Sequence, residues 1–276
     1  MAYKKIEWKV QDGIGRLVLN RPDVLNALDW EILGEVDQCL AEAEKDPEVR
    51  VIILQGSGRC FSAGYELGGS EGLTGPRGVA DYGRGIWNSR AHVQGHLQYF
   101  QRIWNLWKPV IGQAHGFAVA GGCELLMHCD IICCAEGTRI GYPVTRWMAS
   151  GDVIPVLAWR FGLAKSREMS MGLLISAEEA YRLGGINYVF PRDQLDQETE
   201  KIARRLATIN PELLMLDKMQ SNRVFEVMGF TPSLYAGSEF DSISHMSNTS
   251  RAYQEAVKQY GLAEALKKLN EPWGGV

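Results

Sequence analysis

The chain has 276 residues, of which 46% are hydrophobic and 22% charged, a balance typical of folded globular proteins rather than disordered or fibrous ones. Its net charge of −4 at neutral pH argues against nucleic-acid binding, which normally needs a basic surface. Its apolar runs are far shorter than the roughly 20 residues of a membrane helix, and its first residues lack a secretory pattern. We therefore expect a cytoplasmic protein with no nucleic-acid or membrane partner.

The N-terminal part predicts a βαβ unit. Residues 14–19 alternate apolar with other residues and stop before Arg21-Pro22, as a strand does. Apolar residues then recur at three- and four-residue steps over 29–43, which indicates a helix with one buried face. The continuous apolar run 51–54 is typical of a strand buried on both faces.

The middle of the chain predicts further alternation of strands and helices. Residues 68–89 are rich in glycine and read as a long loop, and an aromatic helix follows and ends at Lys108-Pro109. Strands are expected at 110–114 and 131–135, with a glycine-rich turn at 116–122 between them that leads into a short helix. Beyond residue 175 the pattern is helical, over 177–184, 194–208 and 250–268.

Six cysteines lack CxxC spacing and a nearby histidine pair, which argues against a zinc site and a disulfide framework. We expect them to be reduced and mostly buried. They are Cys39, Cys60, Cys123, Cys129, Cys133 and Cys134.

Two glycine-containing turns, at 60–67 and 118–125, each follow a predicted strand. Glycine lets the backbone approach a ligand closely, and two N–H groups that converge on one oxygen form an oxyanion hole for an enolate. Two ordinary strand-to-helix turns would give the same local pattern. A single turn of this kind would be interpreted as an ordinary strand-to-helix turn and not as part of an oxyanion hole.

The order and spacing of these strings resemble the crotonase, or enoyl-CoA hydratase/isomerase, superfamily along nearly the whole chain. The resemblance implies an α/β fold, a crotonase-like repeated ββα spiral over 1–195, with a C-terminal helical trimerisation region over 196–276. It also implies an acyl-CoA thioester substrate, no cofactor beyond the coenzyme A of that substrate, and a homotrimer or hexamer. The strings are Gly15-Arg16-Leu17-Val18-Leu19-Asn20-Arg21-Pro22, Asn26-Ala27-Leu28, Val51-Ile52-Ile53-Leu54-Gln55-Gly56, Cys60-Phe61-Ser62-Ala63-Gly64, Lys108-Pro109-Val110-Ile111, Gly121-Gly122-Cys123-Glu124-Leu125, Cys129-Asp130-Ile131-Ile132, Ser176-Ala177-Glu178-Glu179-Ala180 and Gly184.

The resemblance assigns the oxyanion hole to the backbone N–H groups of Tyr65 and Gly121. Glu124, one helical turn on, becomes the candidate acid/base, although a glutamate there can also simply stabilise the helix dipole. Coenzyme A is implied to run along the 59–67 turn, so Arg59 and Ala63 are candidate contacts. Arg59 can equally be a solvated turn residue.

One position departs from the family. Enoyl-CoA hydratases usually carry a second glutamate directly after a proline, where this chain has Pro143-Val144. Because two carboxylates let one activate water while the other delivers a proton, ordinary two-glutamate hydration is in doubt. Asp152, eight positions on, resembles an acid that isomerases, hydrolases and dehalogenases of the superfamily keep. It can also be a helix N-cap.

His92 and His96 lie one helical turn apart. We rank them first as core or solvated histidines, then His96 as an active-site base, and a metal site last, because no third ligand is suggested. Three functions stay open: lyase or isomerase chemistry with Glu124, hydrolysis or dehalogenation with Asp152 and His96, and a non-catalytic binding module. Retention of Glu124 favours the first.

Overall fold

The computed structural model describes residues 3–67, 86–151 and 154–274. Its larger sheet has six strands in the order β1-β2-β3-β4-β6-β9. β1 and β2 form an antiparallel hairpin, and every other neighbour is parallel. The hairpin turn is Asp12-Gly13 with φ of +52° and +78°, a sequence suited to such a turn. The strands are β1 (Ile6–Gln11), β2 (Ile14–Leu19), β3 (Val51–Gly56), β4 (Val110–Ala114), β6 (Ile131–Ala135) and β9 (Tyr188–Phe190).

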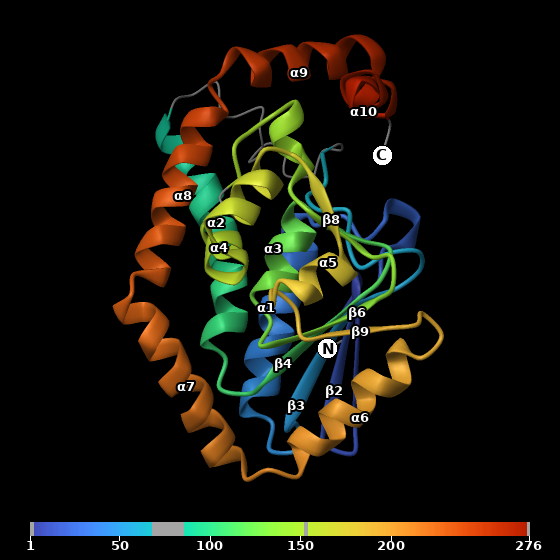
Figure 1. Cartoon of the computed structure of the whole chain (residues 1–276), viewed down its shortest axis with the longest axis vertical. Helices are drawn as coiled ribbons and strands as arrows, with labels where there is room; N and C mark the ends of the chain where they lie inside the picture. Colours follow the sequence, from blue (N-terminus) through green and yellow to red (C-terminus); the bar gives the residue numbers. More distant parts are fainter. Residues whose placement is uncertain (1–2, 68–85, 152–153, 275–276) are drawn as a thin grey trace.

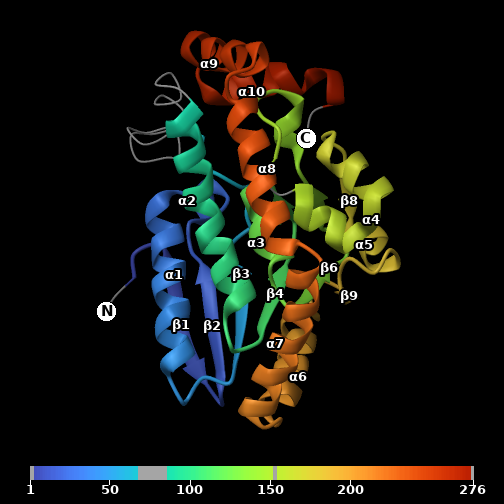
Figure 2. The ribbon, with the colours of Figure 1, turned by 90° about the vertical axis from the view of Figure 1, so that its left-hand side faces the viewer.

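β3 shows why the run 51–54 is apolar throughout. Ile52 and Leu54 pack into the main core with α1 (Trp30–Lys45) and α2 (Ile86–Asn105). Val51 and Ile53 pack instead with α6 (Leu195–Ala207), on the other face of the strand. Figure 2 shows α1 and α2 side by side along the sheet. The prediction of a strand buried on both faces is confirmed.

A smaller sheet of three strands lies beside the first and brings the two glycine-containing turns together. Its order is β5-β7-β8, with β5 and β7 parallel and β8 antiparallel. Strand, strand and helix follow one another as β4, β5, α3 and again as β6, β7, α4, which is the expected ββα repeat (Figure 1). These elements are β5 (Phe117–Val119), β7 (Arg139–Gly141), β8 (Leu174–Ser176), α3 (Gly121–Met127), α4 (Ile154–Ser170) and α5 (Ala177–Arg182).

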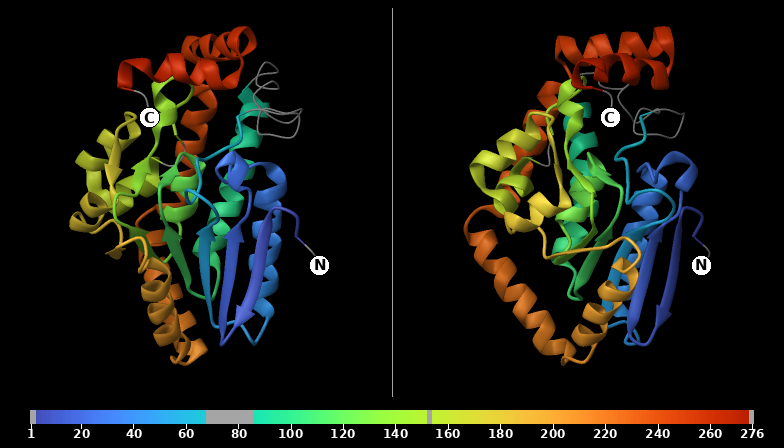
Figure 3. Two further views of the ribbon diagram at one scale, coloured as in Figure 1. Left: turned by 90° about the vertical axis from the view of Figure 1, so that its right-hand side faces the viewer. Right: turned by 45° about the vertical axis from the view of Figure 1, so that its right-hand side comes forward.

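The C-terminal part is helical, as the sequence predicts. Figure 3 shows α6 and α7 meeting in a V at one end of the molecule, with α9 and α10 across the opposite end. The helical pattern expected over 250–268 corresponds to two helices, because Gly261, with φ +76° and ψ 161°, separates them. The remaining helices are α7 (Pro211–Val227), α8 (Phe230–Ser244), α9 (Asn248–Tyr260) and α10 (Leu262–Asn270).

Two expectations need correction. β1 was not predicted from the sequence, although Ile6, Trp8 and Val10 alternate there with polar residues, the pattern of a strand with one buried face. The loop expected over 68–89 is helical from Ile86 onward, where α2 begins, and 68–85 lie outside the described residues. Within the described ranges, every helix is too short or too polar to cross a lipid bilayer.

Candidate active site

The 60–65 turn is held by the segment that precedes α1. The Asn26 side chain is fully buried and donates to the backbone carbonyls of Ser57, Cys60 and Phe61, at 2.8, 3.0 and 3.2 Å. Leu28 pairs with Tyr65 in a parallel bridge. These contacts fix the turn before any ligand arrives, because a buried amide with several acceptors has one preferred geometry.

The second turn packs directly on the first. Ser62 pairs with Ala118, and its N–H donates to the carbonyl of Phe117 at 3.1 Å. A β-carbon on Gly64 would stand 3.2 Å from the nitrogen of Gly121, so Gly64 must be glycine for the turns to approach this closely. Ala120 adopts φ +50° and ψ −128°, a conformation that costs a non-glycine residue about 1–3 kcal/mol.

The structure therefore brings together the two residues predicted to form the oxyanion hole. Gly121 is the first residue of α3, so its N–H has no acceptor within the helix. Tyr65 follows Gly64 on the facing turn. Two backbone amides presented by adjoining turns are the arrangement that stabilises an enolate oxygen.

Glu124 lies in the first turn of α3 and is 1% exposed. Its Oε2 accepts a hydrogen bond from the hydroxyl of Tyr65. Sequence reasoning used only the backbone of Tyr65 and missed this side chain. The available signal was the presence of a large hydroxylated residue directly after the Ala63-Gly64 pair.

The histidines of α2 are buried beside this pair. His96 is 4% exposed, its ring stacks on Trp30 at 4.3 Å between centroids, and the Tyr65 ring lies 5.0 Å away. Burial, with smaller contributions from His92 and His245, holds the pKa of His96 well below its usual 6.5. His96 is thus a neutral core imidazole in contact with the ring of Tyr65.

The remaining candidates lie around the first turn or outside the described part of the chain. Ala63 is partly exposed and its N–H donates to Leu25, while Arg59 is exposed at the start of the same turn. Val144 is buried at 4% exposure among apolar side chains. Asp152 lies outside the described residues, so neither interpretation of its role is tested. Within the described residues, no group of three or more His, Cys, Asp or Glu is placed to hold a metal.

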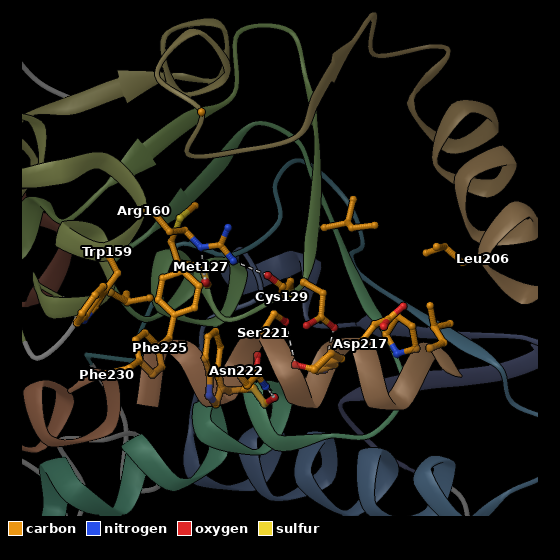
Figure 4. Close-up of a pocket in the computed structure, with 18 residues that line it drawn as sticks. Met127, Cys129, Trp159, Arg160, Leu206, Asp217, Ser221, Asn222, Phe225 and Phe230 are labelled. Carbon is orange, nitrogen blue, oxygen red and sulfur yellow. Dashed lines mark hydrogen bonds and ion pairs between the residues drawn. The ribbon is translucent and has the colours of Figure 1, made fainter. Parts of the chain in front are cut away.

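A cavity of about 500 Å³ lies elsewhere, between α7 and the core at the far end of α3 (Figure 4). Its cations already bind protein groups. Lys218 Nζ contacts Asp130 Oδ2 at 2.8 Å, and Arg160 Nε donates to the carbonyl of Met127 at 2.7 Å. This cavity is a space left where α7 packs against the spiral, and neither Tyr65 nor Glu124 lines it.

Comparison with known proteins establishes the family of this chain. Residues 9–260 match the sequence model of the enoyl-CoA hydratase/isomerase family. This chain belongs to that family. The resemblance to the crotonase superfamily is therefore confirmed.

Individual relatives and a solved structure support the same family assignment. A putative enoyl-CoA hydratase of Mycobacterium tuberculosis is 33% identical over 86% of this chain and 79% of its own length. The crotonyl-CoA hydratase of Syntrophomonas wolfei is 30% identical, over 80% of this chain and 83% of that one. The crystal structure of an enoyl-CoA hydratase/isomerase from Xanthobacter autotrophicus Py2, 30% identical, superposes with a TM-score of 0.88 over 98% of this chain and 99% of its own. The crotonase-like fold is confirmed.

Proposed function

We propose that this protein catalyses a hydratase-type reaction on an enoyl-CoA thioester, with Glu124 as acid/base and the amides of Tyr65 and Gly121 as the oxyanion hole. The observation that carries the proposal is the meeting of the two turns at Gly64, beside the buried carboxyl group of Glu124. The family relationship limits the substrate to the acyl-CoA class.

The geometry supports one sequence of steps. The thioester oxygen accepts hydrogen bonds from the two amides, which makes C3 of the enoyl group electrophilic. The Glu124 carboxylate takes a proton from water while the water oxygen bonds to C3. The C2–C3 π electrons move toward the carbonyl, and the resulting enolate is stabilised by the amides. A proton delivered to C2 completes the 3-hydroxyacyl thioester.

Coenzyme A binds along the 59–67 turn in this proposal, with no further cofactor. Arg59 is exposed there, and its guanidinium can pair with a phosphate of the coenzyme. Ala63 offers partly exposed backbone on the same turn. A cytoplasmic location remains a prediction.

We further propose a homotrimer or hexamer, built through the helical region 196–276 beside the spiral 1–195. Its support is the number of large apolar side chains that α7 and α8 expose on one chain, which a soluble monomer rarely does. Exposed fractions of more than half are found at Leu213, Leu216, Val224, Val227, Met228 and Phe240.

The test is an assay of the purified protein with a panel of enoyl-CoA thioesters. We expect products heavier by one water, with no release of free coenzyme A. Glu124→Gln should lower turnover by about two orders of magnitude or more, because a general acid/base contributes that much. Release of coenzyme A thiol at the rate of substrate loss would instead assign the protein to the hydrolases and give Asp152 the leading role.

A further inference from the structure

The proposed hydration requires two proton transfers, one away from water and one to C2. The position where related hydratases carry a second glutamate is Val144, whose side chain is buried and cannot exchange a proton. A second proton-transfer group must come from elsewhere in the site, or Glu124 must serve both steps from one place.

The side chain of Tyr65 lies where such a group is needed. A β-carbon on Gly121 would stand 2.8 Å from Cζ of the Tyr65 ring, so the phenol crosses directly over the oxyanion-hole glycine. Its hydroxyl donates to Oε2 of Glu124. One residue thus supplies both an amide beside the proposed enolate and a hydroxyl bonded to the proposed base.

The phenol is held in this place by aromatic packing. The Tyr65 ring lies 5.0 Å from the ring of His96 and 6.4 Å from that of Phe100. His96 in turn stacks on Trp30. Because packed aromatic rings restrict both side-chain torsions, the hydroxyl is preorganised against Glu124 rather than free to turn into solvent.

From this juxtaposition we infer that the hydroxyl of Tyr65 is the second proton-transfer group of the site, in the role that a glutamate at position 144 would have. This inference rests on the proposed function. After water has added to C3 and Glu124 has taken its proton, the C2 carbon of the enolate takes the hydroxyl proton of Tyr65. The phenolate then takes the proton held by Glu124, which returns both groups to their starting states. The net change is the addition of one water.

The decisive variant is Tyr65→Phe, which removes the hydroxyl and keeps the ring and the backbone amide. On the enoyl-CoA that the wild type hydrates fastest, we expect kcat to fall about a hundredfold or more, with KM within about threefold of wild type. The matched control is Tyr99→Phe. Tyr99 lies on α2, 6.2 Å from the ring of Trp30, and its change should leave both constants unaltered.

A pH profile separates proton transfer from a merely structural role. The wild-type kcat should fall at high pH as the Tyr65 hydroxyl ionises, and that basic limb should be absent from the residual activity of Tyr65→Phe. Replacement of Tyr65 by 3-fluorotyrosine keeps the hydroxyl but makes it more acidic, so the basic limb should move to lower pH. This variant also decides the matter if Tyr65→Phe folds poorly.

Two outcomes overturn the inference in distinguishable ways. If Glu124→Gln abolishes turnover but Tyr65→Phe keeps kcat within about threefold of wild type, or only raises KM, the proposed function stands and the Tyr65 hydroxyl has no proton-transfer role. If Glu124→Gln itself turns over normally, or if the wild type hydrates no member of the panel, the proposed function fails and this inference falls with it.

Discussion

A β-carbon on Gly64 would stand 2.6 Å from the β-carbon of Ala120, closer than two such atoms ever approach. The two turns that carry the proposed oxyanion hole therefore fit together only because residue 64 has no side chain. Both backbones are also in the left-handed half of conformational space, with φ of +94° at Gly64 and +50° at Ala120. Any side chain at position 64 must push the turns apart.

Gly64→Ala should thus lower kcat on the enoyl-CoA substrate by about two orders of magnitude, the usual cost of losing one oxyanion-hole donor. The matched control is Gly137→Ala, since Gly137 also has positive φ, at +72°, but a β-carbon there would meet nothing within 4 Å. Both variants should lose stability from backbone strain, of order 1 kcal/mol. Equal turnover in the two would show that the turns do not need this close contact.

Asn26→Ala should destabilise the protein by about 2–4 kcal/mol, because it leaves two buried carbonyls and one partly buried carbonyl without their shared donor. Its Oδ1 also accepts from the N–H of Arg21 at 2.9 Å, and that bond is lost as well. Asn20→Ala, which removes a single hydrogen bond to Glu7 in an exposed place, should change stability by less than about 0.5 kcal/mol. Urea unfolding of the two variants beside the wild type measures the difference.

His128 should make folding stability depend on pH in the acid range. Burial lowers its pKa from 6.5 to about 4, so the folded protein excludes a proton that the unfolded chain takes up below pH 6.5. The stabilisation of the folded state by neutral His128 is therefore fully present above pH 6.5. As pH falls from 6.5 toward 4, the free energy of unfolding decreases by up to about 1.4 kcal/mol per pH unit.

His128→Gln removes that dependence, since glutamine does not titrate. The unfolding free energy of the variant, subtracted from that of the wild type at each pH, should give a difference that rises from pH 4 to pH 6.5 and then stays level. A difference that does not change over this range would mean that His128 takes up a proton as readily in the folded protein as in the unfolded chain.

The exposed apolar face of α7 should mediate assembly. Val227 is 82% exposed on one chain, so Val227→Glu should be tolerated by the fold and should lower the mass measured by light scattering from three or six chains to one. Met171→Glu is the control, because Met171 is 64% exposed but precedes β8, away from α7. If light scattering shows that the wild type is itself a monomer, the proposal of a trimer or hexamer is wrong.

Much of this fold could be predicted because its signals are local. The run 51–54 is apolar because this one strand is buried on both faces. The turns at 60–67 and 118–125 are marked in the sequence by Gly64 and Gly121. The contact between the hydroxyl of Tyr65 and the carboxyl of Glu124 could not be predicted in the same way. These residues are 59 positions apart, and their turns are brought together by the pairing of Ser62 with Ala118 and by hydrogen bonds of the Ser62 backbone to Phe117 and Val119.

The histidines illustrate the same limit. The spacing of His92 and His96 predicts that both lie on one face of a helix, and burial on that face follows. That His96 would stack on Trp30 depends on how α2 crosses α1, which is set by packing between two helices distant in sequence. The spacing of the histidines identifies which face of the helix is buried, but it does not identify the residue that packs against that face.

The hydrogen bonds from the Asn26 side chain to the first turn limit how far that turn can move. Because the three acceptors of Asn26 come from the 57–61 backbone and its own segment leads into α1, that turn cannot open without disturbing the main core. Amide hydrogens held there, such as the N–H of Ala63 on Leu25, should exchange with solvent only as slowly as those of β3, through global unfolding. Discrimination among acyl groups must then come from other walls of the site, since this wall is as rigid as the sheet behind it.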